Sequence, residues 1–138
     1  MVKKNEYSNK SYFGWENDNG IGEKLINQIK KGQKTATCSP KELYGEEELK
    51  ELLAMKDQYV TVMDKFDNPR CNIHIIDIFE TSFGNPDPRL IEGESVSNGN
   101  NVDVFKQQHR RAWKEEIEEG FILNDDTILI VELFKLIN

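Results

Sequence analysis

The segment Gly32–Thr37 reads Gly-Gln-Lys-Thr-Ala-Thr and places one lysine beside two threonines. A threonine hydroxyl becomes a nucleophile only when a base takes its proton, and a lysine can be that base if its surroundings lower its pKa. Lys34 and Thr37 are three positions apart, so on a regular strand their side chains face opposite ways. Both can reach one substrate only if Lys34 lies on a turn after Gly32. The alternative is a solvated turn lysine followed by ordinary strand threonines.

A second segment with chemical potential is Glu92-Gly93-Glu94, in which a glycine separates two carboxylates. Glycine permits unusual backbone angles, which could aim both carboxylates inward. Carboxylate oxygens suit hard divalent cations, but no third ligand stands at a diagnostic spacing, so the sequence predicts no metal and no cofactor. The alternative is a solvated acidic loop in a chain of net charge −7.

The cysteines and one histidine are further candidates. Cys38 and Cys71 lack the spacing of a zinc or redox pair, and two cysteines are too few for a disulfide framework. Cys71 opens an apolar run and is interpreted as a small buried hydrophobic residue, whereas Cys38 is either the same or a thiol near the lysine and threonine segment. His109 shares an apolar helix face with Phe105 and Trp113, so it is either a hydrogen-bonded core residue or part of a site.

The net charge of −7 and the isoelectric point of about 4.9 limit the partners that suit this chain. RNA is a polyanion, and its affinity for proteins comes largely from Lys and Arg contacts to phosphate. We therefore expect any RNA contact to use a local basic patch or a pocket that captures one nucleoside. Two basic groups could form such a patch, with aromatic residues that could stack on a base: Lys24, Lys30, Lys31, Lys34 and Lys41; Arg110, Arg111 and Lys114; and the aromatic Tyr12, Phe13 and Trp15.

The chain of 138 residues fits one domain. No apolar run approaches the roughly 18 residues of a membrane helix, and the polar start lacks the apolar centre of a signal peptide, so we expect a cytoplasmic protein. Glycines and prolines interrupt residues 82–101, which read as a long loop. The remaining pattern favours an α+β fold, a small curled sheet or barrel with packed helices: helices over 21–31, 41–55 and 102–119, and strands over 34–39, 59–64, 70–79 and 127–137.

Taken together, several segments resemble the ASCH domain family. They stand in the family's order and cover about residues 14–137. Two stretches depart from the family pattern: Phe105-Lys106 stands where Trp-Arg is usual, and Ser95–Gly99 replaces the usual sequence after the second glutamate. The segments that carry the resemblance are Gly32–Thr37 after an amphipathic helix, the hairpin Val62–Cys71, Glu92-Gly93-Glu94, and the helix ending in His109 with the closing strand through Val131–Phe134.

The resemblance implies a PUA-like β-barrel of about five or six strands, with helices packed around it and a cleft beside it. It implies a single ASCH domain over residues 1–138, with a core of about 14–137 and a polar N-terminal extension, 1–13. The implied function is binding of RNA or a modified nucleoside in a cleft with ribonuclease-like hydrolytic activity. One alternative is an amidohydrolase acting on N4-acetylcytidine. Another is a non-catalytic regulatory binding protein, which the two departures favour.

The resemblance also implies roles for individual residues. In a deacetylating subgroup of the family, the residues that match Lys34, Thr37 and Glu94 form the catalytic set. The threonine would attack, the lysine would take its proton, and the carboxylate would protonate the leaving amine or hold the lysine. The implied substrate-binding residues are Thr35, Glu92, Lys24, Trp15, His109 and Arg110. The sequence does not determine an oligomeric state.

Overall fold

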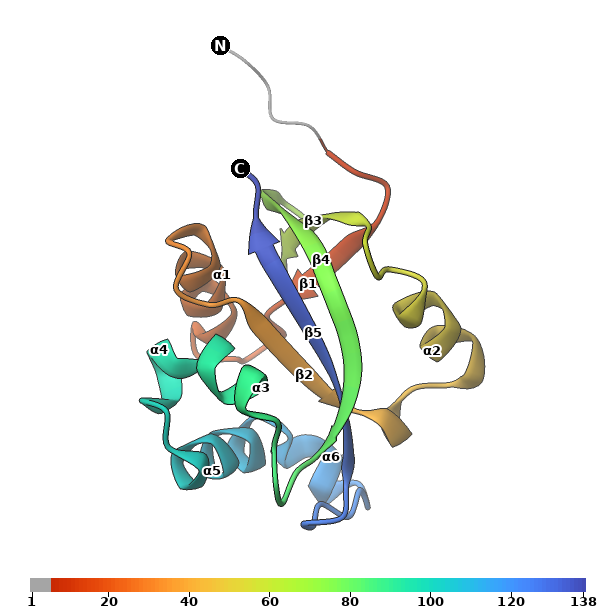
Figure 1. Ribbon diagram of the computed structural model, residues 1–138, viewed down its shortest axis with the longest axis vertical. Helices are drawn as coiled ribbons and strands as arrows, with labels where there is room; N and C mark the ends of the chain where they lie inside the picture. The colour runs from red at the N-terminus through yellow and green to blue at the C-terminus, as the bar shows by residue number, and fades with distance from the viewer. Residues whose placement is uncertain (1–5) are drawn as a thin grey trace.

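Two long antiparallel strands, β4 (Pro69–Ser82) and β5 (Ile128–Leu136), form the centre of a five-stranded sheet (Figure 1). The computed structural model describes residues 6–138. On one side, β3 (Tyr59–Asp64) pairs antiparallel with β4, and β1 (Lys10–Phe13) adds parallel to β3. On the other side, β2 (Ala36–Pro40) pairs antiparallel with β5. The order β1-β3-β4-β5-β2, with helices around the sheet, confirms the predicted α+β class and strand number.

The prediction of a closed barrel is wrong. β3 pairs with the first half of β4, up to His74, whereas β2 pairs with Leu129–Leu133 of β5, which face Asp77–Thr81 in the second half of β4. A bulge between Ile75 and Asp77 separates these halves. The two edge strands therefore lie at opposite ends of the β4–β5 ribbon, and no pairing joins β1 to β2 within residues 6–138. The sheet is open.

Helices lie on both sides of the sheet and connect its strands (Figure 1). Within the part of the chain that the structure describes, no helix is long and apolar enough to cross a membrane. The helices are α1 (Ile21–Lys30), α2 (Glu46–Leu53), α3 (Pro88–Gly93), α4 (Ser95–Asn98), α5 (Val102–Ala112) and α6 (Lys114–Glu118), with a 3₁₀ turn at Lys41–Leu43.

The two longer predicted helices are each interrupted. The expected helix over 41–55 is a 3₁₀ turn followed by α2, because Gly45 has extended backbone angles and starts a new helix. The expected helix over 102–119 is divided at Trp113, where φ −101° and ψ 20° depart from helical values. The first interruption falls at Tyr44 and Gly45 and the second at Trp113, where the backbone leaves the helical region. Apolar periodicity does not record such local changes.

Two segments expected to be irregular contain regular structure. Residues 82–101 hold α3 and α4 rather than one long loop. Asp87 caps α3 by accepting a hydrogen bond from the Arg89 N–H, and Pro88 occupies the first helical position. Lys10–Phe13, interpreted as part of a polar extension, forms β1, while residues 1–5 of that extension lie outside the described residues.

The side chains between these elements form two apolar clusters. The first packs α1 against β1, β3 and β4, with Ile26 and Ile29 of α1 fully buried. The second lies beneath α3 and α5 and contains Phe83, Phe105 and the alternate residues Ala36 and Cys38 of β2. β5 contributes to both clusters. The second cluster is the one that surrounds the polar residues considered next.

Candidate functional site

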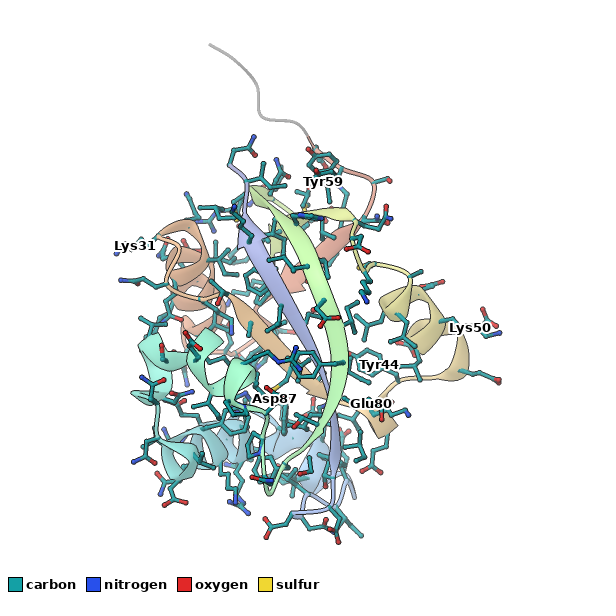
Figure 2. The ribbon with its side chains drawn as sticks, viewed as in Figure 1. Lys31, Tyr44, Lys50, Tyr59, Glu80 and Asp87 are labelled. Atoms are coloured by element: carbon teal, nitrogen blue, oxygen red, sulfur yellow. The ribbon has the colours of Figure 1, made fainter. Side chains whose placement is uncertain are left out.

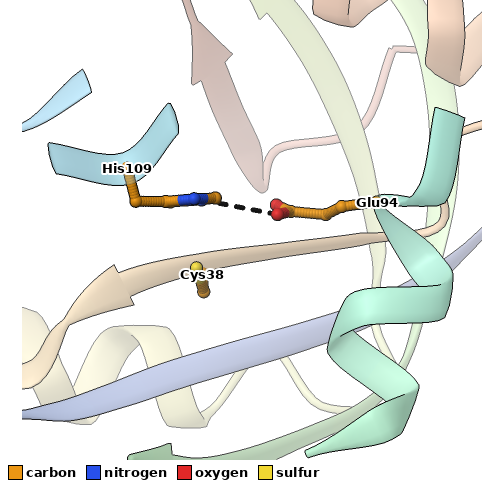
Figure 3. A group of neighbouring side chains, drawn as sticks. All are labelled: Cys38, Glu94 and His109. Carbon is orange, nitrogen blue, oxygen red and sulfur yellow. Dashed lines mark ion pairs between the residues drawn. The ribbon is translucent and has the colours of Figure 1, made fainter. Parts of the chain in front are cut away.

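Four polar side chains meet beneath α3 and α5, at the β2 edge of the sheet. Cys38 comes from β2, Glu94 directly follows α3, and His109 comes from α5 (Figure 3). Lys34 lies just before β2. The exposed fraction is 4% for Lys34, 7% for Glu94 and 8% for Cys38, and it is 14% for the His109 side chain. These four residues are referred to below as the buried cluster.

Glu94 is the centre of the buried cluster. Lys34 Nζ lies 3.1 Å from Glu94 Oε2, and His109 Nε2 lies 3.4 Å from Glu94 Oε1. Lys34 Nζ also donates to the Ala36 carbonyl at 2.6 Å. His109 Nδ1 lies 2.9 Å from the Phe105 carbonyl, so Nδ1 carries a hydrogen and donates. Each carboxylate oxygen of Glu94 therefore faces a different basic group.

Lys34 reaches the buried cluster from the turn that follows α1. Gly32 has φ 72°, the left-handed conformation that ends many helices. The N–H of Lys34 donates to the Gln28 carbonyl at 3.1 Å, which keeps Lys34 in the turn and out of the strand. The structure thus places Lys34 as the sequence requires for a shared site.

Thr37 does not join Lys34. Along β2 the side chains alternate, with Ala36 and Cys38 buried against α3 and α5 and Thr37 on the opposite face. Thr37 is paired across the sheet with Glu132 of β5. The two catalytic candidates from this segment therefore lie on different faces of the sheet.

Gly93 lets α3 come close enough to β2 to place Glu94. A Cβ added at Gly93 would lie 2.3 Å from the Ala36 Cβ, which a real side chain cannot occupy. The Thr35 N–H donates to the Gly93 carbonyl at 2.9 Å and joins the two segments. The expectation that glycine aims both carboxylates inward is wrong: Glu94 is buried and Glu92 is exposed. The glycine serves a close approach rather than an unusual backbone angle.

The charges in the buried cluster shift one another. Burial would raise the pKa of Glu94, but the positive charges of Lys34 and His109 outweigh it and hold that pKa at about 2. Burial would lower the pKa of His109, but Cys38 and Glu94 outweigh it and raise that pKa well above 6.5. Burial raises the pKa of the Cys38 thiol. At neutral pH the ionised Glu94 carboxylate thus lies between Lys34 and a protonated His109. Together these three side chains can hold and transfer protons.

An open cleft of about 560 Å³ is lined by Gly93 and Thr35, the sequence neighbours of Glu94 and Lys34 in the buried cluster. It runs between α3 and the last residues of β5. Thr35, Glu92, Arg89 and Lys135 supply polar and charged groups to its walls. Its remaining lining comes mainly from apolar side chains and glycine backbone: Ile76, Leu133, Phe134, Leu136, Gly32 and Gly93.

Comparison with protein families assigns the chain to one of them. A family model described as the ASCH domain matches residues 11–138. The chain belongs to the ASCH domain family. The resemblance seen in the sequence is thereby confirmed.

Solved structures support the fold of this ASCH domain. It is similar to the ASCH domain from Lactobacillus crispatus JV V101, with a TM-score of 0.74 and 21% identity over 94% of this chain and 80% of that chain. It is similar to a protein from Enterococcus faecalis V583, with a TM-score of 0.74 and 22% identity over 94% and 76% of the two chains. Among curated proteins, none has a sequence close enough to match.

In this ASCH domain the predicted site residues lie in the buried cluster, in the open cleft or in neither. Lys34, Glu94 and His109 meet in the buried cluster. Thr35 and Glu92 line the open cleft. Four others lie in neither place: Thr37 faces the opposite side of β2, Lys24 and Trp15 are exposed on and before α1, and Arg110 is exposed with its guanidinium over the Phe83 ring at 5.2 Å.

Three residues of the buried cluster and the cleft were not assigned to a site from the sequence: Cys38, Arg89 and Lys135. Cys38 was left open between a core residue and a thiol near the site, and the structure places it in the buried cluster. Cys38 lies two residues after Ala36 on β2, so the two side chains share a face. This alternation was the sequence signal that could have placed Cys38 in the site. Arg89 and Lys135 line the cleft, and because they come from segments far apart in the sequence, no local pattern joins them.

Proposed function

We propose that this ASCH domain binds RNA, or a modified nucleoside, in the open cleft between α3 and β5. The observation that carries the proposal is the composition of the cleft, in which apolar side chains stand with two cations, a carboxylate and a hydroxyl around a volume of about 560 Å³. Pockets that hold small ligands span about 300–1,000 Å³ and combine apolar walls with a few polar groups. ASCH domains are generally linked to RNA binding, which agrees with this chemistry.

Each part of a nucleotide has a suitable group in the cleft. Leu133 and Ile76 provide apolar surface for the face of a base. The Glu92 carboxylate can accept hydrogen bonds from an exocyclic amine, and the Thr35 hydroxyl can donate or accept at another edge. Lys135 and Arg89, the latter also paired with Asp77 and Asp87, line the cleft and can supply cations to phosphate. The arrangement suits one nucleotide better than a long duplex.

The net charge of the chain makes this local arrangement necessary. A chain of net charge −7 repels RNA at long range, so affinity must come from a few contacts. Binding should be strongest at low salt and should weaken as salt rises. Because the number of phosphate contacts is small, the slope of that dependence should be shallow.

The test is a titration of labelled short RNA oligomers and of free nucleosides, followed by fluorescence anisotropy and calorimetry at low salt. Lys135→Ala should weaken RNA binding and reduce the salt slope by about 0.7, the contribution of one phosphate contact on a single strand. Lys50→Ala is the control, because Lys50 projects from α2 on the far side of the molecule (Figure 2). No binding of either class at low salt, or equal losses in the two variants, would overturn the proposal.

Hydrolysis is a second candidate function, favoured by the buried pair of Lys34 and Glu94 at 3.1 Å. Because Thr37 lies on the opposite face, a reaction at this pair would use water or the Cys38 thiol as nucleophile. Chromatography of N4-acetylcytidine incubated with the protein separates amide hydrolysis from RNA cleavage, which a gel detects. Formation of neither product, with binding intact, would support the non-catalytic alternative.

A further inference from the structure

Three atoms able to ligate a metal converge within the buried cluster. One atom each from Cys38, Glu94 and His109 lies within 4.8 Å of the other two. The residues come from three separate elements, β2, the end of α3, and α5, so the packing of the fold brings them together. Figure 3 shows the imidazole and the carboxylate directed toward one another, with the sulfur beside them. We propose that these three side chains bind a zinc ion.

The hydrogen bond of His109 prepares its ring for a metal. Nδ1 donates to the Phe105 carbonyl at 2.9 Å, which leaves Nε2, 3.4 Å from Glu94 Oε1, as the nitrogen open to a metal. Histidines that ligate metals commonly donate their other ring N–H to a carbonyl or carboxylate, which fixes the orientation of the ring. A Cys-His-Glu catalytic triad would need its thiol and carboxylate at opposite nitrogens. Here the Phe105 carbonyl occupies Nδ1 and the carboxylate faces Nε2.

The separation of the carboxylate and imidazole ligands, together with the ligand types, favours zinc. Tetrahedral zinc with nitrogen and oxygen ligands at about 2.0–2.1 Å separates those ligands by about 3.4 Å. Glu94 Oε1 and His109 Nε2 are 3.4 Å apart. A thiolate with an imidazole suits zinc, whereas calcium and magnesium prefer oxygen ligands alone.

Lys34 leaves one carboxylate oxygen for the ion. Its amine contacts Glu94 Oε2 at 3.1 Å and the Ala36 carbonyl at 2.6 Å, so it holds the carboxylate with Oε1 toward the other ligands. Three protein ligands are one fewer than a structural zinc site uses. The fourth position would take water or a small anion. The proposal is independent of RNA binding, and either can fail alone.

The first test uses the wild-type full chain, stripped with a chelator. Titration with Zn²⁺ against a chromophoric chelator should give one ion per chain. Co²⁺ should produce the intense absorption of a four-coordinate ion together with a thiolate-to-cobalt charge-transfer band. Zn²⁺ should also slow alkylation of Cys38 by iodoacetamide in the folded protein, while the rate at Cys71 stays unchanged, since Cys71 is buried in the other apolar cluster.

Variants assign the ligands. Cys38→Ser should abolish the charge-transfer band and lower zinc affinity more than about tenfold, and His109→Gln should lower it similarly. Cys71→Ala is the matched control and should keep the band and the affinity. Circular dichroism reports folding, and the alkylation result on the wild-type chain stands even if a variant fails to fold. Absence of stoichiometric binding, a band that persists in Cys38→Ser, or no protection of Cys38 would overturn the proposal.

Discussion

Two glutamates on opposite faces of the sheet, the buried Glu94 and the partly buried Glu132, have opposite electrostatics. Glu94, beneath α3 and α5, has its pKa held at about 2 because Lys34 and His109 outweigh burial. Glu132, on β5 opposite Thr37, has its pKa raised to about 7 because burial is not countered. No ion pair within residues 6–138 includes Glu132.

The comparison shows that burial alone does not indicate where chemistry occurs. A glutamate carboxylate is ionised at pH 7 where cations are within reach, as at Glu94, and about half protonated where burial is not countered, as at Glu132. On the Glu94 side the fold supplies a lysine, a histidine and a thiol around it. On the Glu132 side the face holds Thr37. Its predicted role as nucleophile required Lys34 and Glu94, which lie on the other face. The predictions below test this contrast.

Removing the charge of Glu94 should have the largest effect on stability. Glu94→Gln keeps the shape but leaves Lys34 and His109 without their negative partner, so we expect the free energy of unfolding to fall by about 3–5 kcal/mol at pH 7. Because the pKa of Glu94 is lowered from 4.5 to about 2, its stabilisation is present above pH 4.5 and is lost toward pH 2. Urea denaturation at pH 7 and pH 3 should therefore show the difference shrinking.

The control for this measurement is Glu92→Gln. Glu92 lies two residues away and is exposed, so its replacement should change the free energy of unfolding by no more than about 0.5 kcal/mol. If Glu94→Gln lowers the free energy of unfolding by less than about 1 kcal/mol at pH 7, Glu94 is not stabilised by its cations and the contrast with Glu132 is wrong.

Separating α3 from β2 should have the next largest effect. Gly93→Ala places a Cβ 2.3 Å from the Ala36 Cβ, so the helix must move away and take Glu94 with it. We expect a destabilisation of about 3 kcal/mol by thermal or urea unfolding. NMR titration of the carboxylates should show the pKa of Glu94 rising while that of Glu132 is unchanged. An unchanged Glu94 titration would mean that the close approach does not position the carboxylate.

Removing the charge of Glu132 should stabilise the protein. The pKa of Glu132 is raised from 4.5 to about 7 in the folded state, so its protonated form favours folding and this contribution is lost as pH rises from 4.5 to 7. Glu132→Gln should therefore be more stable than wild type by about 2 kcal/mol above pH 7, a value reduced for partial exposure. The two proteins should be equally stable at pH 4. Equal stability at pH 8 would show that Glu132 finds a partner when charged.

Changing Thr37 should have the smallest effect. Thr37→Val keeps the branched shape, and because the side chain lies away from the buried cluster, we expect RNA binding and any hydrolysis to stay within twofold of wild type. The measurements are the anisotropy titration and the chromatographic assay described above. A loss of hydrolysis of more than about 100-fold would return Thr37 to the catalytic set.

The sequence predicted those parts of the fold that depend on local patterns. α1 and the strands beginning at Tyr59, Pro69 and Ile128 follow from apolar periodicity and turn residues. Barrel closure depends on which halves of β4 and β5 the edge strands use, and periodicity does not encode that register. The helices at 88–98 are too short to show a helical period, although Asp87-Pro88 was a visible start signal.

The part of the site that lies within the segment Gly32–Thr37 was predictable from the sequence. Lys34 could be placed on its turn because Gly32 precedes it, but that placement was expected to let Lys34 and Thr37 share a substrate, and only the structure separates them. The meeting of Cys38, Glu94 and His109 depends on how three elements pack in space. The spacing of these residues along the chain matches no metal motif, so the family resemblance could join Glu94 and His109 in one site while Cys38 was left open between that site and the core.

The shared strands at the centre of the sheet have a consequence for how the molecule unfolds. β5 gives Phe134 to the first apolar cluster and Leu129 and Val131 to the second, and β4 likewise runs past the bulge from one to the other. Neither half can therefore melt while the other stays intact. We expect a single cooperative transition by all probes, with the slowest amide hydrogen exchange in the middle of β5 and no partially folded species that retains only one half.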